Sequence, residues 1–341
     1  MNCDPTAAHL MTLLATLSRT AGRVHPDSTW GDRLARVKYC VRGLLTPWRT
    51  TVWFSQLRSP ALQELVRGHP RIHSKLQRPY LHRRVTLTQR LSVLREHYAF
   101  FTNSLDATQR RAVSSPAGLF LAELPASDPT RYSLRLRYDT QFEKEGELTL
   151  ALQDSVLGEA IFTLSFTVTG WNGKRGTREL FVGGIQGRKG ANDRDEIVAL
   201  TRSLHGLRPK ALLVFAVQRL AEVWGIANLR AVGDSEHIYR HFRKRRAIQT
   251  SYDSFWEECQ GGRDADGNFT LPARPVFRGI DAIPAHKRSL YRKRYALMEL
   301  LGGQLQQAVT ISPAAAVTMP LVLPTMAEPL LPMRVLEQSP A

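Results

Sequence analysis

The chain has 341 residues, of which 43% are hydrophobic, and its 47 Lys and Arg against 30 Asp and Glu give a net charge of +17. Its length and hydrophobic share are typical of a globular protein with one large domain or two ordinary ones. The excess of positive charge favours an anionic partner, such as a lipid headgroup, a phosphorylated cofactor or nucleic acid.

The three cysteines, Cys3, Cys40 and Cys259, are far apart and odd in number. Their spacing argues against a disulfide framework and against a zinc site, so we expect no metal and reduced thiols. The first 17 residues lack the basic region of a secretory signal, and no segment approaches the roughly 18 apolar residues of a membrane span. These features predict a cytoplasmic protein, either free or peripheral to the inner membrane.

Residues 29–105 have a helical and basic pattern. In the segment 30–45, Leu34, Val37, Val41 and Leu44 recur near helical spacing, with Arg and Lys between them. This spacing predicts an amphipathic helix with a cationic face, and such apolar stripes usually belong to the core. Further helices are predicted by the same criterion at about 48–57, 60–67 and 88–105.

The period changes from helical to alternating near Ala117. Short runs rich in β-branched and aromatic residues follow, separated by turn residues, at 119–124, 132–138, 147–153, 160–169 and 177–185. They predict an antiparallel meander with a hairpin turn at Asn172-Gly173. The fold class is therefore α+β, with an N-terminal helical region packed on an antiparallel-rich mixed sheet.

Three regions follow from these patterns: a basic helical region at 1–115, an α/β core at 116–305 and a Pro-rich tail at 306–341. The tail has almost no charge after Thr310, and its composition predicts disorder. A basic amphipathic segment at 287–301 closes the core.

The segment 178–242 is the part of the core whose sequence suggests chemistry. It has an apolar strand at 179–185, a Gly-rich basic turn, two helical segments, a second strand at 228–233 and a short helix. A strand, a turn and a helix in this order can hold a phosphate at the helix N-terminus, because backbone N–H groups and the helix dipole favour an anion there.

Two turns within this segment are candidate anion sites, Gln186–Gly190 and His205–Lys210. The second is the stronger candidate because Pro209 suits a first helical turn and a long helix with a regular apolar stripe follows it. Neither turn matches an established nucleotide-binding motif, so tight turns with solvated cations remain the alternative. The candidate ligand-binding residues are Gln186, Gly187, Gly206, Arg208 and Lys210.

Two basic clusters, 240–246 and 287–294, have cations beside aromatic residues. They suit an anionic membrane surface, and the alternative is a solvated helix face. Nucleic acid ranks below a membrane because the chain has neither an RNP-like aromatic motif nor zinc-finger spacing.

The span from about Tyr80 to Tyr295 resembles the VirK/YbjX family of bacterial proteins. The resemblance rests on several separated motifs: Gly183–Gly187 (GGIQG), Leu204–Lys210 (LHGLRPK), His237–Arg240 (HIYR) and Lys287–Tyr295 (KRSLYRKRY). It implies a bacterial context of virulence or envelope stress, including resistance to antimicrobial peptides. One function that it suggests is a non-enzymatic protein acting at the membrane surface.

A weaker, fold-level resemblance is to the GCN5-related N-acyltransferases, which use acyl-CoA. It implies an enzyme that takes coenzyme A, acyl-CoA or another acyl thioester, with Gly206, Arg208 and Lys210 near the pyrophosphate. Tyr239 would donate a proton to the departing thiolate. Glu179 and His205 are candidate general bases by their chemistry, and the alternatives are a surface carboxylate and a capping histidine.

The acyltransferase hypothesis makes a prediction about geometry. The strands that end at Gln186 and Gly233 should separate above the N-terminus of the helix that begins near Lys210. An open groove there favours binding of an acyl thioester, whereas a gap filled by side chains favours a structural role.

Overall fold

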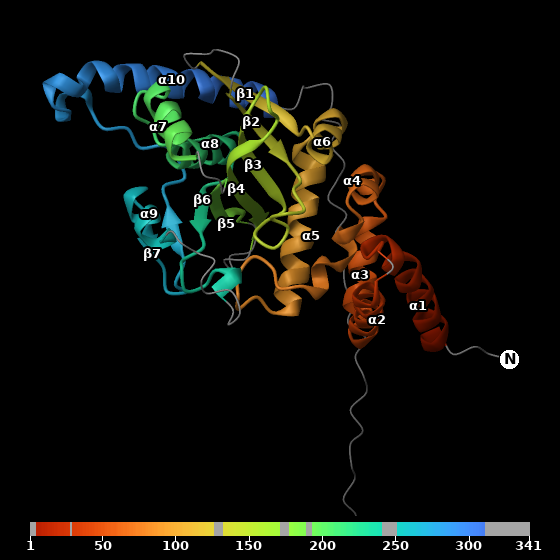
Figure 1. The fold of residues 1–341 in the computed structure, drawn as a ribbon. Helices are drawn as coiled ribbons and strands as arrows, with labels where there is room; N and C mark the ends of the chain where they lie inside the picture. The colour runs from red at the N-terminus through yellow and green to blue at the C-terminus, as the bar shows by residue number, and fades with distance from the viewer. Residues whose placement is uncertain are drawn as a thin grey trace, which may run out of the picture. The chain divides into compact units, whose positions relative to one another are not determined.

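The structure is a computed structural model that describes residues 5–27, 29–125, 132–170, 177–188, 193–240 and 251–310 (Figure 1). The described residues belong to one compact unit with a common hydrophobic core. Helices precede the sheet in the chain, and the change occurs where the sequence period changes. The predicted α+β class is confirmed.

The N-terminal region is helical, as predicted, and begins with a helix that the patterns above did not predict. Its helices are α1 (Pro5–Val24), α2 (Trp30–Leu45), α3 (Pro47–Leu57), α4 (Gln63–Gly68), α5 (Leu87–Ser104) and α6 (Ala107–Ser114), with 3-10 turns η1 (Pro60–Leu62) and η2 (Pro70–Gln77). A capping box formed by Thr86 and Gln89 starts α5, whose buried face includes Leu94 and Tyr98.

Helix α2 has the predicted bounds, but the expectation that its apolar stripe belongs to the core is wrong. Leu34, Val37 and Val41 are 51%, 58% and 49% exposed. The helix instead buries the face of Tyr39 and Gly43. A Cβ at Gly43 would lie 2.6 Å from the Leu17 side chain, so glycine permits α1 to pack closely on this face and turns the stripe outward.

The strands of the described residues form one mixed sheet in the order β1-β2-β3-β4-β5-β6-β8-β7. Their bounds are β1 (Leu119–Leu124), β2 (Tyr132–Arg137), β3 (Leu148–Asp154), β4 (Ala160–Thr169), β5 (Glu179–Gly187), β6 (Asn228–Ala231), β7 (Gly262–Arg263) and β8 (Phe269–Leu271). Strands β1 to β5 form the predicted antiparallel meander, and β5 pairs with β6 in parallel. The predicted turn at Asn172-Gly173 lies outside the described residues.

Helices cover the centre of the sheet. All of β3 and nearly all of β4 is buried, and because side chains alternate between the faces of a strand, both faces must be covered. Helix α5 packs on β4, and α8 (Pro209–Val223) contacts β3, β4 and β5. Helix α7 (Asp193–Ser203) precedes α8, so the helices predicted after the first turn are present.

The remaining elements of the described chain are η3 (Ile238–Arg240), α9 (Tyr252–Glu258), η5 (Ile280–Ala282) and the long helix α10 (Ala285–Val309). Helix α10 packs on α8 and β1 (Figure 1). It extends to Val309, which is buried. Residues 306–309, which the sequence pattern assigned to the tail, are therefore helical. Residues 311–341 and most of the basic cluster 240–246 lie outside the described residues.

Candidate functional site

The parallel pair β5 and β6 separates halfway along β5. Pairing runs from Glu179 opposite Asn228 to Val182 opposite Ala231, and a further hydrogen bond joins the Val232 N–H to the Val182 carbonyl at 2.9 Å. Beyond this point β5 continues along β4. The two strands therefore part after Val182 of β5 and Val232, which follows β6.

A bulge in β5 lets the loop between β2 and β3 pack directly against the strand. The register with β4 passes from Gly184 to Val182, so Gly183 is the bulged residue. A Cβ at Gly183 would lie 1.8 Å from the Glu145 carbonyl oxygen, and one at Gly184 would lie 2.2 Å from the Glu145 carboxylate. Both positions need glycine because the loop carrying Glu145 lies directly against the strand.

The Glu145 carboxylate is buried at this bulge, with 1% of the residue exposed. The Gln186 amide donates a hydrogen bond to its Oε2 at 3.1 Å. Burial raises the pKa of Glu145 to about 8, and the Gln186 hydrogen bond opposes that rise. A carboxylate with a pKa near neutrality is suited to accept a proton as a general base.

A buried ion pair anchors the loop that carries Glu145. Two residues further on, the Glu147 carboxylate lies 2.7 Å from the Lys75 ammonium, and both side chains are almost fully buried. Lys75 also donates to the Glu143 carbonyl at 3.0 Å, and the Tyr98 hydroxyl donates to Glu147. The N-terminal helices therefore fix the position of Glu145 on the sheet.

Tyr252 of α9 bridges the ends of the two separated strands. Its backbone N–H donates to Asp234, which follows β6, at 3.0 Å. Its hydroxyl accepts a hydrogen bond from the Ile185 N–H of β5 at 3.4 Å, and its ring stacks on His237. The gap next to β5 is thus partly filled by an aromatic side chain.

Tyr239, the predicted proton donor, lies in η3 beside the same loop. Its ring centroid is 5.6 Å from the Lys144 ammonium, and its ring is 5.7 Å from that of His237. Burial, together with the Glu145 charge, raises the pKa of Tyr239 to about 12. Burial and Glu145 raise the pKa of Tyr252 as well. Both hydroxyls therefore stay protonated at neutral pH.

A cavity of about 490 Å³ opens at the N-terminus of α8. Helices α7, α8 and α9 and Phe162 of β4 line it, and most of its wall is apolar. Arg208 and Lys210 both contribute to the wall. The Lys210 ammonium lies 5.7 Å from the Phe255 ring centroid, and burial lowers the pKa of Lys210. Exposed Arg208 forms an ion pair of 2.8 Å with Glu258.

The cavity and the Glu145 carboxylate both lie beside the second half of β5. A Cβ at Gly187 would lie 3.0 Å from the Phe162 ring, which lines the cavity, and Gly184 contacts Glu145. Three strand residues span roughly 10 Å. Because side chains alternate between the two faces of a strand, Gly187 and the Phe162 ring lie on the face of β5 opposite to Gly184 and Glu145.

The predicted site residues His205 and Gly206 form the turn between α7 and α8. Both have positive φ, 52° and 74°. The His205 carbonyl accepts hydrogen bonds from Arg294 Nε at 3.0 Å and Nη2 at 2.9 Å, and a Cβ at Gly206 would lie 2.8 Å from the same guanidinium. This turn fixes the start of α8 against α10.

Glu179, the other predicted base, lies at the opposite end of β5. Its side chain is fully buried, and its Oε1 lies 3.6 Å from Nη1 of Arg230. Burial raises the pKa of Glu179 to about 7, and Arg230 opposes the rise. Seven residues separate it from Gln186, roughly 23 Å of strand, so the structure does not bring Glu179 together with Tyr239.

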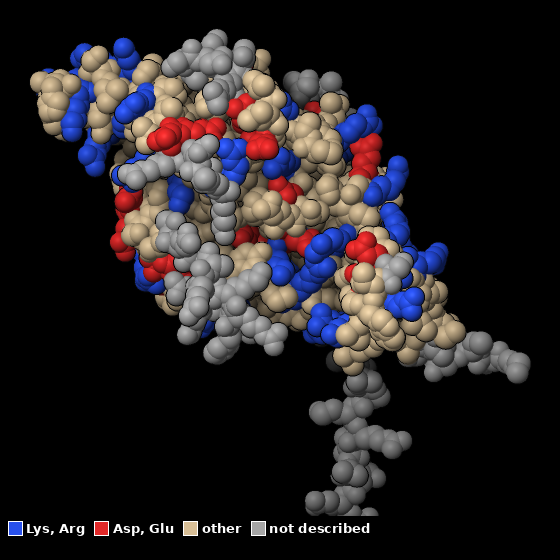
Figure 2. All heavy atoms as spheres, in the orientation of Figure 1, with Lys and Arg blue, Asp and Glu red and all other residues tan. Residues whose placement is uncertain are grey.

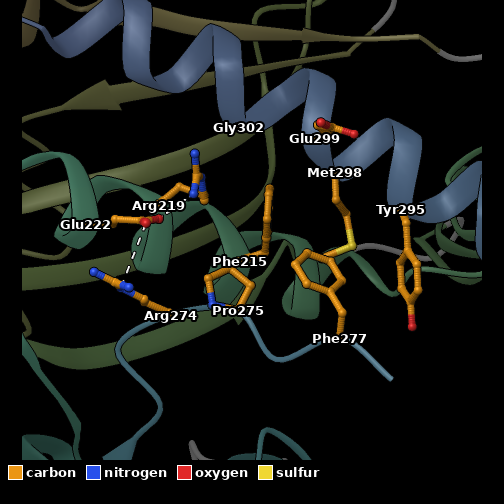
Figure 3. A pocket seen from close by; sticks show the side chains of 10 residues that line it. All are labelled: Phe215, Arg219, Glu222, Arg274, Pro275, Phe277, Tyr295, Met298, Glu299 and Gly302. Atoms are coloured by element: carbon orange, nitrogen blue, oxygen red, sulfur yellow. Dashed lines mark hydrogen bonds and ion pairs between the residues drawn. The ribbon is translucent and has the colours of Figure 1, made fainter. Parts of the chain in front are cut away.

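A second cavity, of about 510 Å³, lies between α8, α10 and the segment 274–277 (Figure 3). Arg219 forms an ion pair with Glu222, and Arg274 approaches the same carboxylate at 3.8 Å. A Cβ at Gly302 would lie 2.9 Å from Nε of Arg219. Because its charges compensate one another within the wall, this cavity is a weaker anion site than the one beside Lys210.

In the part of the chain that the structure describes, no three His, Cys, Asp or Glu side chains gather as ligands for a metal ion. Nor does any helix there have the length and hydropathy needed to cross a membrane.

Comparison with known proteins identifies the family. Residues 28–307 match the family described as protein of unknown function (DUF535), and the chain belongs to it. It is 32% identical over 300 residues to the uncharacterized protein YbjX of Escherichia coli K12, covering 87% of this chain and 90% of that protein. An uncharacterized protein of Haemophilus influenzae is 26% identical over 66% of this chain and 73% of its own length. No solved structure matches the chain.

Proposed function

We propose that the chain is an acyltransferase that takes an acyl thioester such as acyl-CoA as donor. The observation that carries this proposal is the cavity with Arg208 and Lys210 at the N-terminus of α8, together with the Glu145 carboxyl that is buried where β5 leaves β6. The proposed site takes an anionic small molecule whose reactive end lies close to Glu145.

The N-terminus of α8 supplies the donors for the phosphate groups. Pro209 has no N–H, and the Lys210 and Ala211 N–H groups precede the first helical hydrogen bond, which runs from Leu212 to Arg208. Such N–H groups and the helix dipole favour an anion. Burial lowers the pKa of Lys210, so an anion in the cavity would also stabilise its charged form.

The transfer step needs one base and one acid. Glu145 takes the proton of an amine or hydroxyl acceptor as the acceptor forms its bond to the thioester carbonyl carbon. The carbon–sulfur bond then breaks, the thiolate takes the proton of Tyr239, and the proton held by Glu145 passes to the Tyr239 oxygen, which restores both groups. The pKa of Glu145, about 8, suits the first role, and the protonated state of Tyr239 suits the second.

The apolar wall of the cavity suits the uncharged part of the donor. Phe162, Ile197 and Phe255 line it, and burying apolar surface contributes roughly 25 cal/mol per Å². Tyr252 has to release the Ile185 N–H for a ligand to pair with β5. That bond is long, at 3.4 Å, and is therefore weak.

Thermal unfolding with coenzyme A and with octanoyl-CoA tests donor binding. A ligand bound only by the native state stabilises it, and we expect about 1 mM of either compound to raise Tm by about 2–5 °C. Arg208→Ala and Lys210→Met should each reduce this shift. Arg111→Ala is the matched control, because Arg111 forms a comparably exposed ion pair with Glu64 on α4. Absence of a shift, or equal shifts in all variants, contradicts the proposal.

A further inference from the structure

Five large apolar side chains recur at helical spacing on one exposed face of α2, and an exposed tryptophan follows at the start of α3; we call these six residues the α2 stripe. It consists of Trp30 (83% exposed), Leu34 (51%), Val37 (58%), Val41 (49%), Leu45 (75%) and Trp48 (61%). Single exposed apolar residues are ordinary on protein surfaces, but a contiguous apolar row usually marks an interaction site. Nothing in the acyl-transfer proposal uses this face.

Cations flank the α2 stripe on both sides. At about 100° per residue, Arg33 lies to one side of the row, and Lys38 and Arg42 lie to the other. None of the three forms an ion pair within the described part of the chain. Arg36 differs, because its guanidinium donates to the His25 carbonyl at 2.8 Å and so holds the segment between α1 and α2. Figure 2 shows a mainly uncharged surface where α1 and α2 lie, with Lys and Arg among it.

The charge on this face decides between two kinds of occupant. Residues 30–48 contain four cations and a single acid, Asp32, which caps the helix together with Thr29. A second copy packed symmetrically on the α2 stripe would bring like charges together, because both partners present the same patch. An anionic surface complements the same cations. A tryptophan at each end of the row also suits a bilayer interface, where the indole ring prefers to lie.

We propose that the α2 stripe docks the protein on an anionic phospholipid bilayer. The helix lies in the plane of the interface, and the side chains of the α2 stripe, including Trp30, Val37 and Val41, insert between the headgroups. Arg33, Lys38 and Arg42 contact the lipid phosphates. The helix keeps its fold in both states, because its buried face of Tyr39 and Gly43 already packs on α1. The surface is separate from the acyl-transfer site, so either proposal can fail alone.

Co-sedimentation of the full chain with vesicles tests the docking. Vesicles with equal parts of phosphatidylcholine and phosphatidylglycerol should retain the protein at low salt, and vesicles of phosphatidylcholine alone should retain much less. Because each cation near a charged surface contributes about fivefold, Arg33→Glu with Lys38→Glu should weaken retention by more than about 25-fold. The triple variant Leu34→Gln, Val37→Gln, Val41→Gln should weaken it by about tenfold or more.

The matched control for the glutamine variant is Val156→Gln with Leu157→Gln, which replaces exposed apolar residues of the β3–β4 turn. It should pellet like the wild type. Near-native circular dichroism and unchanged Tm for all variants show that the changes act at the surface. The proposal is overturned if the wild type ignores anionic vesicles, or if both glutamine variants pellet equally. It is also overturned if sedimentation velocity shows a wild-type dimer that the triple variant converts to a monomer.

Discussion

Two buried glutamates with raised pKa values lie at β5, but their surroundings differ: Glu179 is the first residue of the strand, whereas Glu145 packs from the β2–β3 loop against its second half. At the first end, Glu179 lies beside the Arg230 guanidinium, in the part of the strand that pairs with both neighbours. At the other end, Glu145 contacts the Gln186 amide, where β5 has left β6 and a cavity begins nearby. The pKa values, about 7 and about 8, do not separate the two sites.

The two sites differ in the hydrogen-bonding or ion-pair partner of each glutamate and in the pairing of the strand beside it. A cation beside a buried carboxylate in a continuous sheet offsets a desolvated charge, which is a structural arrangement. The Glu145 carboxyl is instead held by a neutral amide beside two tyrosines, which is the arrangement that the proposed acyl transfer requires. A perturbed pKa therefore identifies a functional residue only together with the access that the backbone gives it.

Removing the cation at the structural end should have the largest effect on stability. Arg230→Met leaves Glu179 buried without a positive charge, and we expect a loss of about 3 kcal/mol in urea unfolding at pH 8, where Glu179 is ionised. At pH 5 the carboxyl is protonated and the loss should be smaller. Adding Glu179→Gln should restore part of the stability at pH 8. A loss that does not depend on pH would show that Arg230 acts through its other ion pairs, with Asp264 at 2.6 Å and Asp266 at 3.3 Å.

Neutralising the carboxyl at the open end should change stability in the opposite direction. Burial raises the pKa of Glu145 from 4.5 to about 8, so the native state binds more protons than the unfolded state between these values. Ionisation therefore costs stability as pH rises from about 5 to 8, and the cost is constant above pH 8. Glu145→Gln should be more stable than the wild type by about 2 kcal/mol or more at pH 8 and nearly equal at pH 5.

The matched control is Glu257→Gln, an exposed carboxylate on α9. Its effect on the free energy of unfolding should be small at both pH values. A Glu145→Gln difference that stays the same from pH 5 to pH 8 would contradict a raised pKa and would remove the main support for Glu145 as a base.

Local patterns were sufficient to predict much of the fold. The bounds of α2, β1 and β4 follow from apolar periodicity and turn residues, because these signals lie within the elements themselves. Which face of a helix is buried depends on its neighbours. For α2, Gly43 lets Leu17 approach closely, and this contact decides the outcome against the longer apolar stripe.

Glu145 could not be identified from the sequence because its environment comes from distant segments. The loop around Glu145 has the polar residues of an exposed turn. The burial of Glu145 depends on a bulge in β5 and on the Lys75 ion pair with Glu147. One local signal was present: two consecutive glycines, Gly183 and Gly184, inside an apolar strand indicate close approach of another segment. The predicted residues Arg208 and Lys210 do line a cavity, whereas the chemistry of Glu179 alone could not predict its place beside Arg230 at the start of β5.

The most direct test of the account is the pH dependence of thiol release from octanoyl-CoA with water as the acceptor. We expect the wild-type rate to rise with pH and to level off above about pH 8, as Glu145 ionises. Glu145→Gln should lower the plateau by about 10²-fold, and Glu179→Gln should leave it unchanged. Equal rates for the wild type and Glu145→Gln, or an equal loss in both variants, would contradict the assignment of the base to the open end of β5.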